Sequence, residues 1–98
     1  MMQEGGAIDL KTRVEKWSVK LKVNPRIVRV YPMRRKWGSC STTGVITLAM
    51  DLADREPEFR DFVIAHELLH LRYANHSRLF KAIMTMHVPN WRSLDAQR

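Results

Sequence analysis

The 98-residue sequence has little cysteine, glycine or proline and no long hydrophobic run. Its one cysteine, Cys40, cannot form a disulfide within the chain, which fits a reducing cytoplasm. Glycine and proline supply four residues each, too few for a fibrous or low-complexity protein. The longest strongly apolar run, residues 45–50, is too short to cross a bilayer, and residues 1–7 lack the charged-then-apolar order of a signal peptide. The sequence therefore predicts a globular cytoplasmic protein with no membrane partner.

Acidic residues are also scarce. Ten Asp and Glu stand against 17 Lys and Arg, so the formal net charge is +7. Residues 11–36 hold ten of the basic side chains and only one acid, Glu15. Such a field attracts polyanions, and we expect weak nucleic-acid association through residues 11–36. The alternative is a surface that only keeps the chain soluble, because the run lacks the interleaved aromatic residues of a base-stacking platform.

The first half of the chain predicts one helix and a small sheet. Asp9 is a suitable N-cap for a helix through residue 21, whose apolar side chains recur at spacings of four and three. Residues 26–31 alternate polar and apolar side chains and predict a strand. Residues 37–50 predict a hairpin in which Gly44 takes the positive φ of a tight turn.

The second half predicts two helices. Pro57 suits the first turn of a helix that we expect to reach about Ala74 and that is apolar on almost every side. Ser77 is a suitable N-cap for a following helix, which Pro89 ends. We expect one domain over residues 1–98, with residues 1–8 and 93–98 loose.

An HExxH motif, residues 66–70, lies in the middle of the first of these two helices. Residues four apart share one face of a helix, so the imidazoles of His66 and His70 can bind one Zn²⁺ while Glu67 points to a water beside it. Polar side chains are costly to bury in an apolar helix unless something satisfies them, and a metal does so. The motif therefore predicts a catalytic zinc with Glu67 as general base.

The third metal ligand is chosen among three residues, since no glutamate follows Glu67. We predict His76, six residues after His70, and keep His87 and Asp95 as alternatives. The ligand spacing matches the zinc motif HExxHxxGxxH, but Tyr73 stands at its glycine, so we expect the chain to turn at Asn75. Three protein ligands and a water are the usual catalytic zinc arrangement.

Other interpretations of the motif stay open. The two histidines are alternatively hydrogen-bonded core residues, with Glu67 paired to Arg60 or Arg72, or the zinc is structural, with Cys40 as a fourth ligand. The hydroxyl of Tyr73 or Tyr31 is a candidate for substrate or transition-state contacts, although a core role is the more ordinary one. An extended peptide can pair with an exposed strand of the hairpin, for which residues 45–50 are the candidate; alternatively, this strand is interior.

The chain resembles the YgjP-like zinc metallopeptidases, a domain-of-unknown-function family related to SprT-like proteins and minimal zincins. The resemblance covers about residues 25–92 and rests on three elements: an RxWGSC element (residues 35–40), HExxHxxxxxHS (residues 66–77), and PNW (residues 89–91). It implies a zinc-dependent peptidase with one Zn²⁺ per chain on His66, His70 and His76, and with Glu67 as the general base. Related SprT-like proteins act on DNA-bound proteins, which is compatible with the basic residues 11–36.

Together these features predict an α+β, minimal zincin-like core. It has a front helix, a small antiparallel or mixed sheet of about three strands, an HExxH helix beneath the sheet and a C-terminal helix. The predicted function is hydrolysis of peptide bonds in a peptide or protein substrate. The alternatives are a basic nucleic-acid-binding module with a structural zinc, and a zincin-like metal or peptide binder without turnover.

Overall fold

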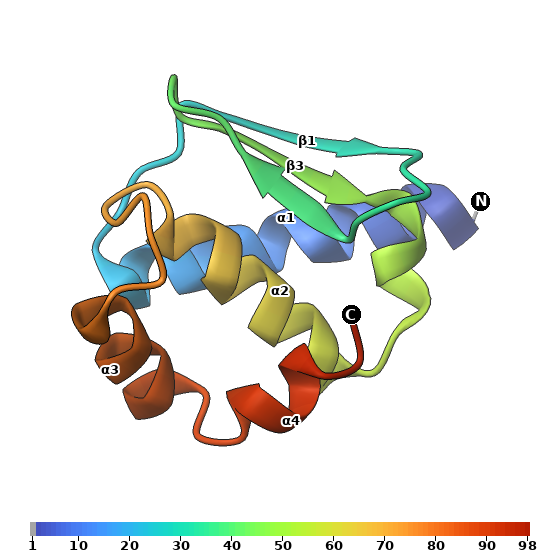
Figure 1. The fold of residues 1–98 in the computed structure, drawn as a ribbon. Helices are drawn as coiled ribbons and strands as arrows, with labels where there is room; N and C mark the ends of the chain where they lie inside the picture. The colour runs from blue at the N-terminus through green and yellow to red at the C-terminus, as the bar shows by residue number, and fades with distance from the viewer. Residues whose placement is uncertain (1) are drawn as a thin grey trace.

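The structure, a computed structural model, describes residues 2–98, with side chains from residue 5 onward. Within this range a small sheet packs against a layer of helices (Figure 1). The elements in chain order are α1 (Met2–Leu21), β1 (Ile27–Tyr31), β2 (Gly38–Cys40), β3 (Val45–Ala49), the 3₁₀ helix η1 (Met50–Asp54), α2 (Pro57–Leu69), α3 (Arg78–His87) and α4 (Trp91–Asp95). The predicted α+β class and the mixed three-stranded sheet are confirmed.

The sheet has the strand order β1-β3-β2, so the last strand in sequence lies in the middle. β1 runs parallel to β3, with Arg29 opposite Thr47, and β2 runs antiparallel to β3, with Ser39 opposite Thr47. Gly44 has φ 89°, the positive value expected for the turn between β2 and β3. Of the two alternatives for residues 45–50, the exposed strand for substrate is wrong and the interior strand is confirmed, because both edges of β3 are paired and four of its five residues are buried.

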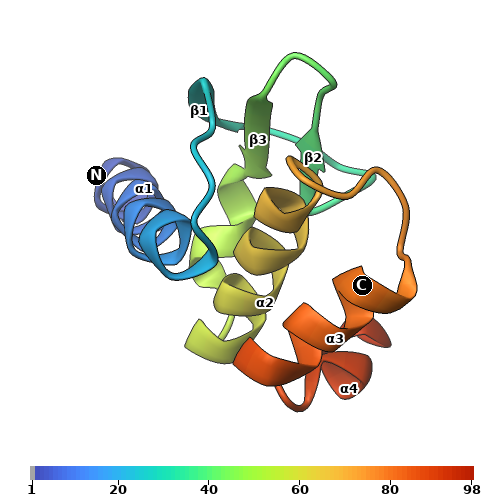
Figure 2. The same cartoon turned by 90° about the vertical axis from the view of Figure 1, so that its left-hand side faces the viewer.

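The helices lie on one side of the sheet, and α2 is the element that most others contact. Figure 1 shows the sheet above α1 and α2, and Figure 2 shows α3 and α4 on the side of α2 away from α1. Nine of the 13 residues of α2 are buried, which explains why the sequence of this helix is apolar on almost every side. The largest fully buried side chains come from all these layers: Leu10, Ile46, Leu48, Phe59, Phe62, Leu68 and Phe80 among them.

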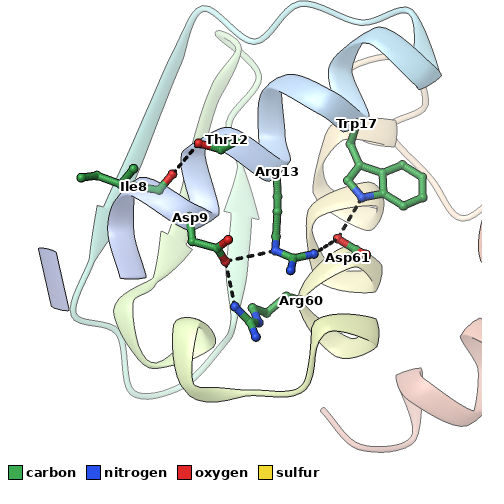
Figure 3. Close-up of polar contacts among 7 residues, drawn as sticks. All are labelled: Ile8, Asp9, Thr12, Arg13, Trp17, Arg60 and Asp61. Carbon is green, nitrogen blue, oxygen red and sulfur yellow. Dashed lines mark hydrogen bonds and ion pairs between the residues drawn. The ribbon is translucent and has the colours of Figure 1, made fainter. Parts of the chain in front are cut away.

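A polar cluster joins α1 to α2 (Figure 3). Asp61 of α2 accepts hydrogen bonds from Arg13 Nη1 at 2.9 Å and from Trp17 Nε1 at 3.0 Å. Asp9 accepts from Arg13 Nε at 3.0 Å and from Arg60 Nη1 at 2.7 Å. The prediction that Asp9 caps the first helix is therefore wrong: α1 begins seven residues earlier, and Asp9 binds two arginines from within it. Its carboxylate links the two helices.

Two other boundaries differ from the sequence prediction. α2 ends at Leu69 and not near Ala74, so the chain turns directly after the HExxH motif. The short helix α4 was not predicted, although Pro89 does end α3 as expected. The looseness expected of residues 1–8 and 93–98 stays a prediction, and Met1 lies outside the described residues. No helix of the described chain combines the length and apolar character needed to span a membrane.

Candidate metal centre

The first two side chains of the site, those of His66 and Glu67, are buried residues of helix α2. His66 is 7% and Glu67 6% exposed, and both lie in the last turn and a half of the helix. His70 follows as the C-cap residue, still in the right-handed helical region (φ −67°, ψ −13°). Because His70 keeps a helical backbone, its side chain falls on the same face as that of His66, four residues earlier.

A tight turn brings the third histidine to the same place. The amide of Tyr73 donates to the carbonyl of Leu69, and the chain then reverses before Ser77. Ser77 caps α3 as predicted, because its Oγ accepts from the amide of Phe80 at 3.3 Å. His76 thus stands immediately before the cap of α3, where the turn holds it against the end of α2.

The three imidazoles converge through their Nε2 atoms. His76 Nε2 lies 3.0 Å from His66 Nε2 and 3.1 Å from His70 Nε2. In a tetrahedral zinc site with Zn–N bonds of 2.0–2.1 Å, ligand nitrogens stand about 3.3 Å apart. The three residues are grouped closely enough to hold one metal ion, since their ligand atoms all lie within 4.8 Å of one another. The donor set and its spacing therefore fit zinc.

The outer nitrogens of two imidazoles fix which nitrogens carry protons. His70 Nδ1 lies 3.0 Å from the carbonyl oxygen of Tyr73, and His66 Nδ1 lies 3.2 Å from Glu67 Oε2. Both oxygens only accept hydrogen bonds, so each Nδ1 carries the proton and each Nε2 presents a lone pair to the centre. An imidazole that donates its outer N–H to a carboxylate or a backbone carbonyl, and turns its other nitrogen toward the centre, is the pattern that metal-binding histidines show.

The environment of His76 also favours a neutral ring. Desolvation lowers the pKa of its imidazole, and the charges of His66, His70 and Arg98 lower it further, against a smaller opposite effect of Asp95. A neutral imidazole is the form that binds a metal ion. The same side chain is exposed on its outer side, so the centre is open to solvent there.

Phe80 forms the floor of the histidine cluster. Its ring centroid lies 5.5 Å from that of His66, 5.1 Å from that of His70 and 4.9 Å from that of His76. It is 1% exposed and comes from the first turn of α3. Sequence reasoning did not identify the contact of Phe80 with all three candidate ligands, although its spacing from His76 on a capped helix was the available signal.

Strand β2 crosses directly over Glu67. A Cβ added to Gly38 would stand 2.9 Å from Glu67 Cγ and 3.3 Å from Val63 Cγ1, so only glycine fits this crossing. Along the edge of β2 that faces β3, the amide of Ser41 donates to the carbonyl of Val45, and the carbonyl of Trp37 accepts from the amide of Ala49. Bonding groups alternate along a strand, so the backbone amides and carbonyls of Gly38 and Cys40 face the unpaired edge of β2.

Two cavities meet at His66 and Glu67, the first two residues of the motif, which we call the HE pair. They share four lining residues, Lys36, Gly38, His66 and Glu67. One cavity, about 560 Å³, extends toward residues 33–37 and the end of the chain, and we name it the basic arm. The other, about 380 Å³, extends along Ser39 to Thr42 and reaches His70 and Ala74, and we name it the hydroxyl arm. His66 and Glu67 thus face both arms of one cleft, and His70 faces the hydroxyl arm.

Several residues considered from the sequence lie elsewhere. Tyr31 is on β1, the edge of the sheet opposite β2, and the ring of Tyr73 lines neither arm. His87 packs edge-on against Trp17, with ring centroids 6.1 Å apart, and Asp95 pairs with Arg98 at 2.7 Å. Neither belongs to the metal-holding group of the described residues.

The ion pair considered for Glu67 is not formed. Arg60 binds Asp9, and among the described residues the side-chain hydrogen-bond partner of Glu67 is His66. Cys40 lines the hydroxyl arm, where burial and, second, the charge of Glu67 raise the pKa of its thiol. A raised pKa keeps the thiol protonated, which disfavours its use as a zinc-binding thiolate.

Comparison with known proteins adds a family and a fold. The sequence matches the family described as YgjP-like, metallopeptidase domain, over residues 1–97. Among curated proteins no match is found. The structure is similar to that of the metallopeptidase zymogen of Pyrococcus abyssi abylysin, with TM-score 0.79, 22% identity and 90% of each chain covered. The metallopeptidase zymogen of Methanocaldococcus jannaschii jannalysin gives TM-score 0.77 and 22% identity, with 90% of this chain and 91% of that chain covered. At this level of identity the likeness establishes a shared fold.

Proposed function

The chain belongs to the YgjP-like metallopeptidase family, and from that premise we propose that it is a zinc-dependent peptidase with one Zn²⁺ per chain. His66, His70 and His76 would hold the ion, and Glu67 would be the general base. The observation that carries this proposal is the convergence of three Nε2 atoms beside a buried carboxylate that lines the same cleft.

Each residue has a defined part in the proposed reaction. Bound to the three imidazoles, zinc would polarise the scissile carbonyl and make a water more acidic. Glu67 accepts the proton of the attacking water and passes it to the leaving amine nitrogen. The proton on His66 Nδ1 holds the carboxylate of Glu67 on the cleft side of α2, and Tyr73 holds the ring of His70 through its carbonyl oxygen.

We also propose that the substrate binds along the free edge of β2. The outward amides and carbonyls of Gly38 and Cys40 can pair with an extended peptide, as in strand addition. Because Gly38 lies against Glu67, a peptide on this edge passes over the HE pair. This assigns to β2 the role that the sequence had suggested for residues 45–50.

Metal stoichiometry is the first test. Elemental analysis of the purified protein should give one zinc per chain, and His76→Ala should weaken zinc affinity by at least about tenfold because one of three ligands is lost. His87→Ala is the matched control, since His87 packs against Trp17 and not against the cluster. Absence of zinc even after reconstitution would refute the proposal.

Hydrolysis is the second test and separates a peptidase from a zincin-like binder without turnover. The zinc-loaded protein should cleave an unstructured protein such as casein, and Glu67→Gln should abolish cleavage while zinc content and folding persist. Glu15→Gln removes an exposed carboxylate on α1 and should retain activity. Cleavage that survives Glu67→Gln would exclude Glu67 as the base, and zinc binding without any cleavage would favour the binder.

A further inference from the structure

The basic arm of the cleft carries an excess of positive charge. Four cations line it, Arg34, Arg35, Lys36 and Arg98, against the two carboxylates of Asp51 and Glu67. Arg98 is partly neutralised by Asp95 at 2.7 Å. The other three have no ion-pair partner among the described side chains, although four other arginines, at 13, 55, 60 and 98, do. Three consecutive free cations therefore face one cavity.

These cations belong to the same cavity as the proposed base. Lys36 is shared by both arms and stands two residues before Gly38, the residue that crosses over Glu67. A peptide on the edge of β2 that continues past Gly38 toward Lys36 enters the basic arm. A substrate side chain in the basic arm then lies among Arg34, Arg35 and Lys36. Along the substrate, this side chain is within a few residues of the scissile bond, which lies over Glu67.

The two arms differ in charge. Apart from the shared residues, no lysine, arginine or carboxylate of the described chain lines the hydroxyl arm. Its lining includes the hydroxyl side chains of Ser39, Ser41 and Thr42, and His70 is a proposed metal ligand. A carboxylate in that arm would find hydroxyls, whereas a carboxylate in the basic arm would find guanidinium groups that bind it through paired charge-assisted hydrogen bonds. The asymmetry lies along the direction of the bound peptide.

We propose that the basic arm is a specificity subsite for an acidic side chain, so that the protein selects peptides with Asp or Glu on one side of the scissile bond only. The inference rests on the proposed peptidase function and names its substrate class. Because Arg34, Arg35 and Lys36 are exposed, solvent screens each contact, and the selectivity amounts to about three- to tenfold in affinity.

Binding tests the subsite without relying on turnover. The probes are two fluorescein-labelled neutral decapeptides that differ only in a central Glu or Gln, titrated into the zinc-loaded Glu67→Gln protein and followed by fluorescence anisotropy. The Glu peptide should bind about three- to tenfold more tightly at 50 mM salt, and the difference should shrink at 500 mM salt. Equal affinities, or no detectable binding of either peptide, would overturn the proposal.

Two triple variants, each made in the Glu67→Gln background, assign the selectivity to its residues. Arg34→Gln, Arg35→Gln and Lys36→Gln together should abolish the preference for the Glu peptide. Lys11→Gln, Lys16→Gln and Lys20→Gln remove the same charge from α1 and should preserve it. Equal loss in both triples would mean that only net charge matters and would refute a subsite. Circular dichroism and zinc content verify that all proteins are folded and loaded.

Hydrolysis then separates this proposal from the proposed function. Fragments of a peptide mixture cut by the wild-type protein, identified by mass spectrometry, should carry Asp or Glu on one side of the cleavage point and not on the other. Enrichment on both sides would contradict an asymmetric cleft. A binding preference without any cleavage would refute the peptidase function and leave the acidic subsite standing.

Discussion

Gly38 and Glu67 touch where the sheet meets α2, and this contact sets how far the proposed base stands from a substrate. A methyl group on Gly38 would meet Glu67 Cγ at 2.9 Å, closer than nonbonded carbons approach. Gly38→Ala should therefore displace Glu67 or lift β2, lowering kcat/KM by at least about tenfold. Zinc content should be unchanged because the atoms nearest to that methyl group belong to Glu67 and Val63 and not to a candidate ligand. Steady-state hydrolysis and elemental analysis measure both.

Gly5→Ala is the control for that substitution. A Cβ at Gly5 meets nothing within 4 Å, so alanine there should leave activity unchanged and leave or raise the free energy of unfolding, by up to about 1 kcal/mol in a helix. If Gly38→Ala is as active as Gly5→Ala, the close approach of β2 to Glu67 does not constrain the reaction.

His76 predicts how the metal-free protein responds to acid. Desolvation, together with the neighbouring histidines, lowers its pKa in the folded state, so the folded chain binds this proton less readily than the unfolded chain. Protonation of His76 does not affect the free energy of unfolding when the pH is above the ordinary histidine pKa of about 6.5, and it destabilises the folded state as the pH falls below that value. The Tm of the chelator-treated protein should fall between pH 7 and pH 5, and His76→Gln should reduce that slope. Parallel slopes would contradict the assignment.

At the scale of elements, the sequence predicted local patterns better than partners in space. The alternation of residues 26–31 and the turn at Gly44 predicted β1 and the hairpin, and the HExxH spacing predicted the face shared by His66 and His70. The position of β3 between the other two strands was not predictable in this way. It depends on the parallel pairing of β1 with β3, which joins segments separated by β2 and two loops.

The ends of the helices show the same limit. A capping pattern is local, so Ser77 was identified as the cap of α3. Asp9 has the residue type of a cap, but two arginines, one of them 51 residues away, take its carboxylate into the contact between α1 and α2. The helical pattern of residues 70–74 likewise predicted a longer α2, whereas the chain turns there and places His76 beside His66.

Asp61 should be the most sensitive polar residue between α1 and α2. It accepts hydrogen bonds from both Arg13 and Trp17 (Figure 3). Burial by itself lowers the pKa of Arg13, but hydrogen bonds and attraction to Asp9 and Asp61 outweigh it and raise that pKa. Asp61→Ala leaves two donors without their acceptor and should lower the free energy of unfolding by about 1–3 kcal/mol. Urea titration measures it.

Asp54→Ala is the matched control for Asp61→Ala. Asp54 ends η1, is exposed and makes no ion pair among the described residues, so its loss should change the free energy of unfolding by less than about 0.5 kcal/mol. Equal effects of the two substitutions would mean that the cluster between α1 and α2 contributes little to stability.

The junction between α2 and α3 should depend on the metal. The three histidines come from the end of α2 and the turn before α3, so a bound ion would join two helices that otherwise meet through few contacts, Phe80 among them. Chelation should lower the Tm and increase amide hydrogen exchange over residues 66–80, with little change in α1. An unchanged melting curve with chelator would count against a metal at this junction.

At the scale of the whole molecule, the basic residues 11–36 do not form one surface. The lysines of α1 lie on the helix at one side of α2 (Figure 2). Residues 34–36 lie in the segment between β1 and β2, and they line the cleft. A charge excess that looks continuous in the sequence is therefore divided by the fold. The part that borders the cleft is available to a substrate, and the part on α1 is available to a polyanion.

This division predicts weak and nonspecific binding of nucleic acid. A duplex of about 20 base pairs should bind through phosphate contacts with a Kd above about 1 µM at physiological salt, and log Kd should rise linearly with log salt. The triple variant Lys11→Gln, Lys16→Gln and Lys20→Gln should weaken binding and flatten the salt dependence, because it removes three of the four cations of α1. Nanomolar, sequence-dependent binding that persists in high salt would instead favour the nucleic-acid module, with the histidine centre as its structural support.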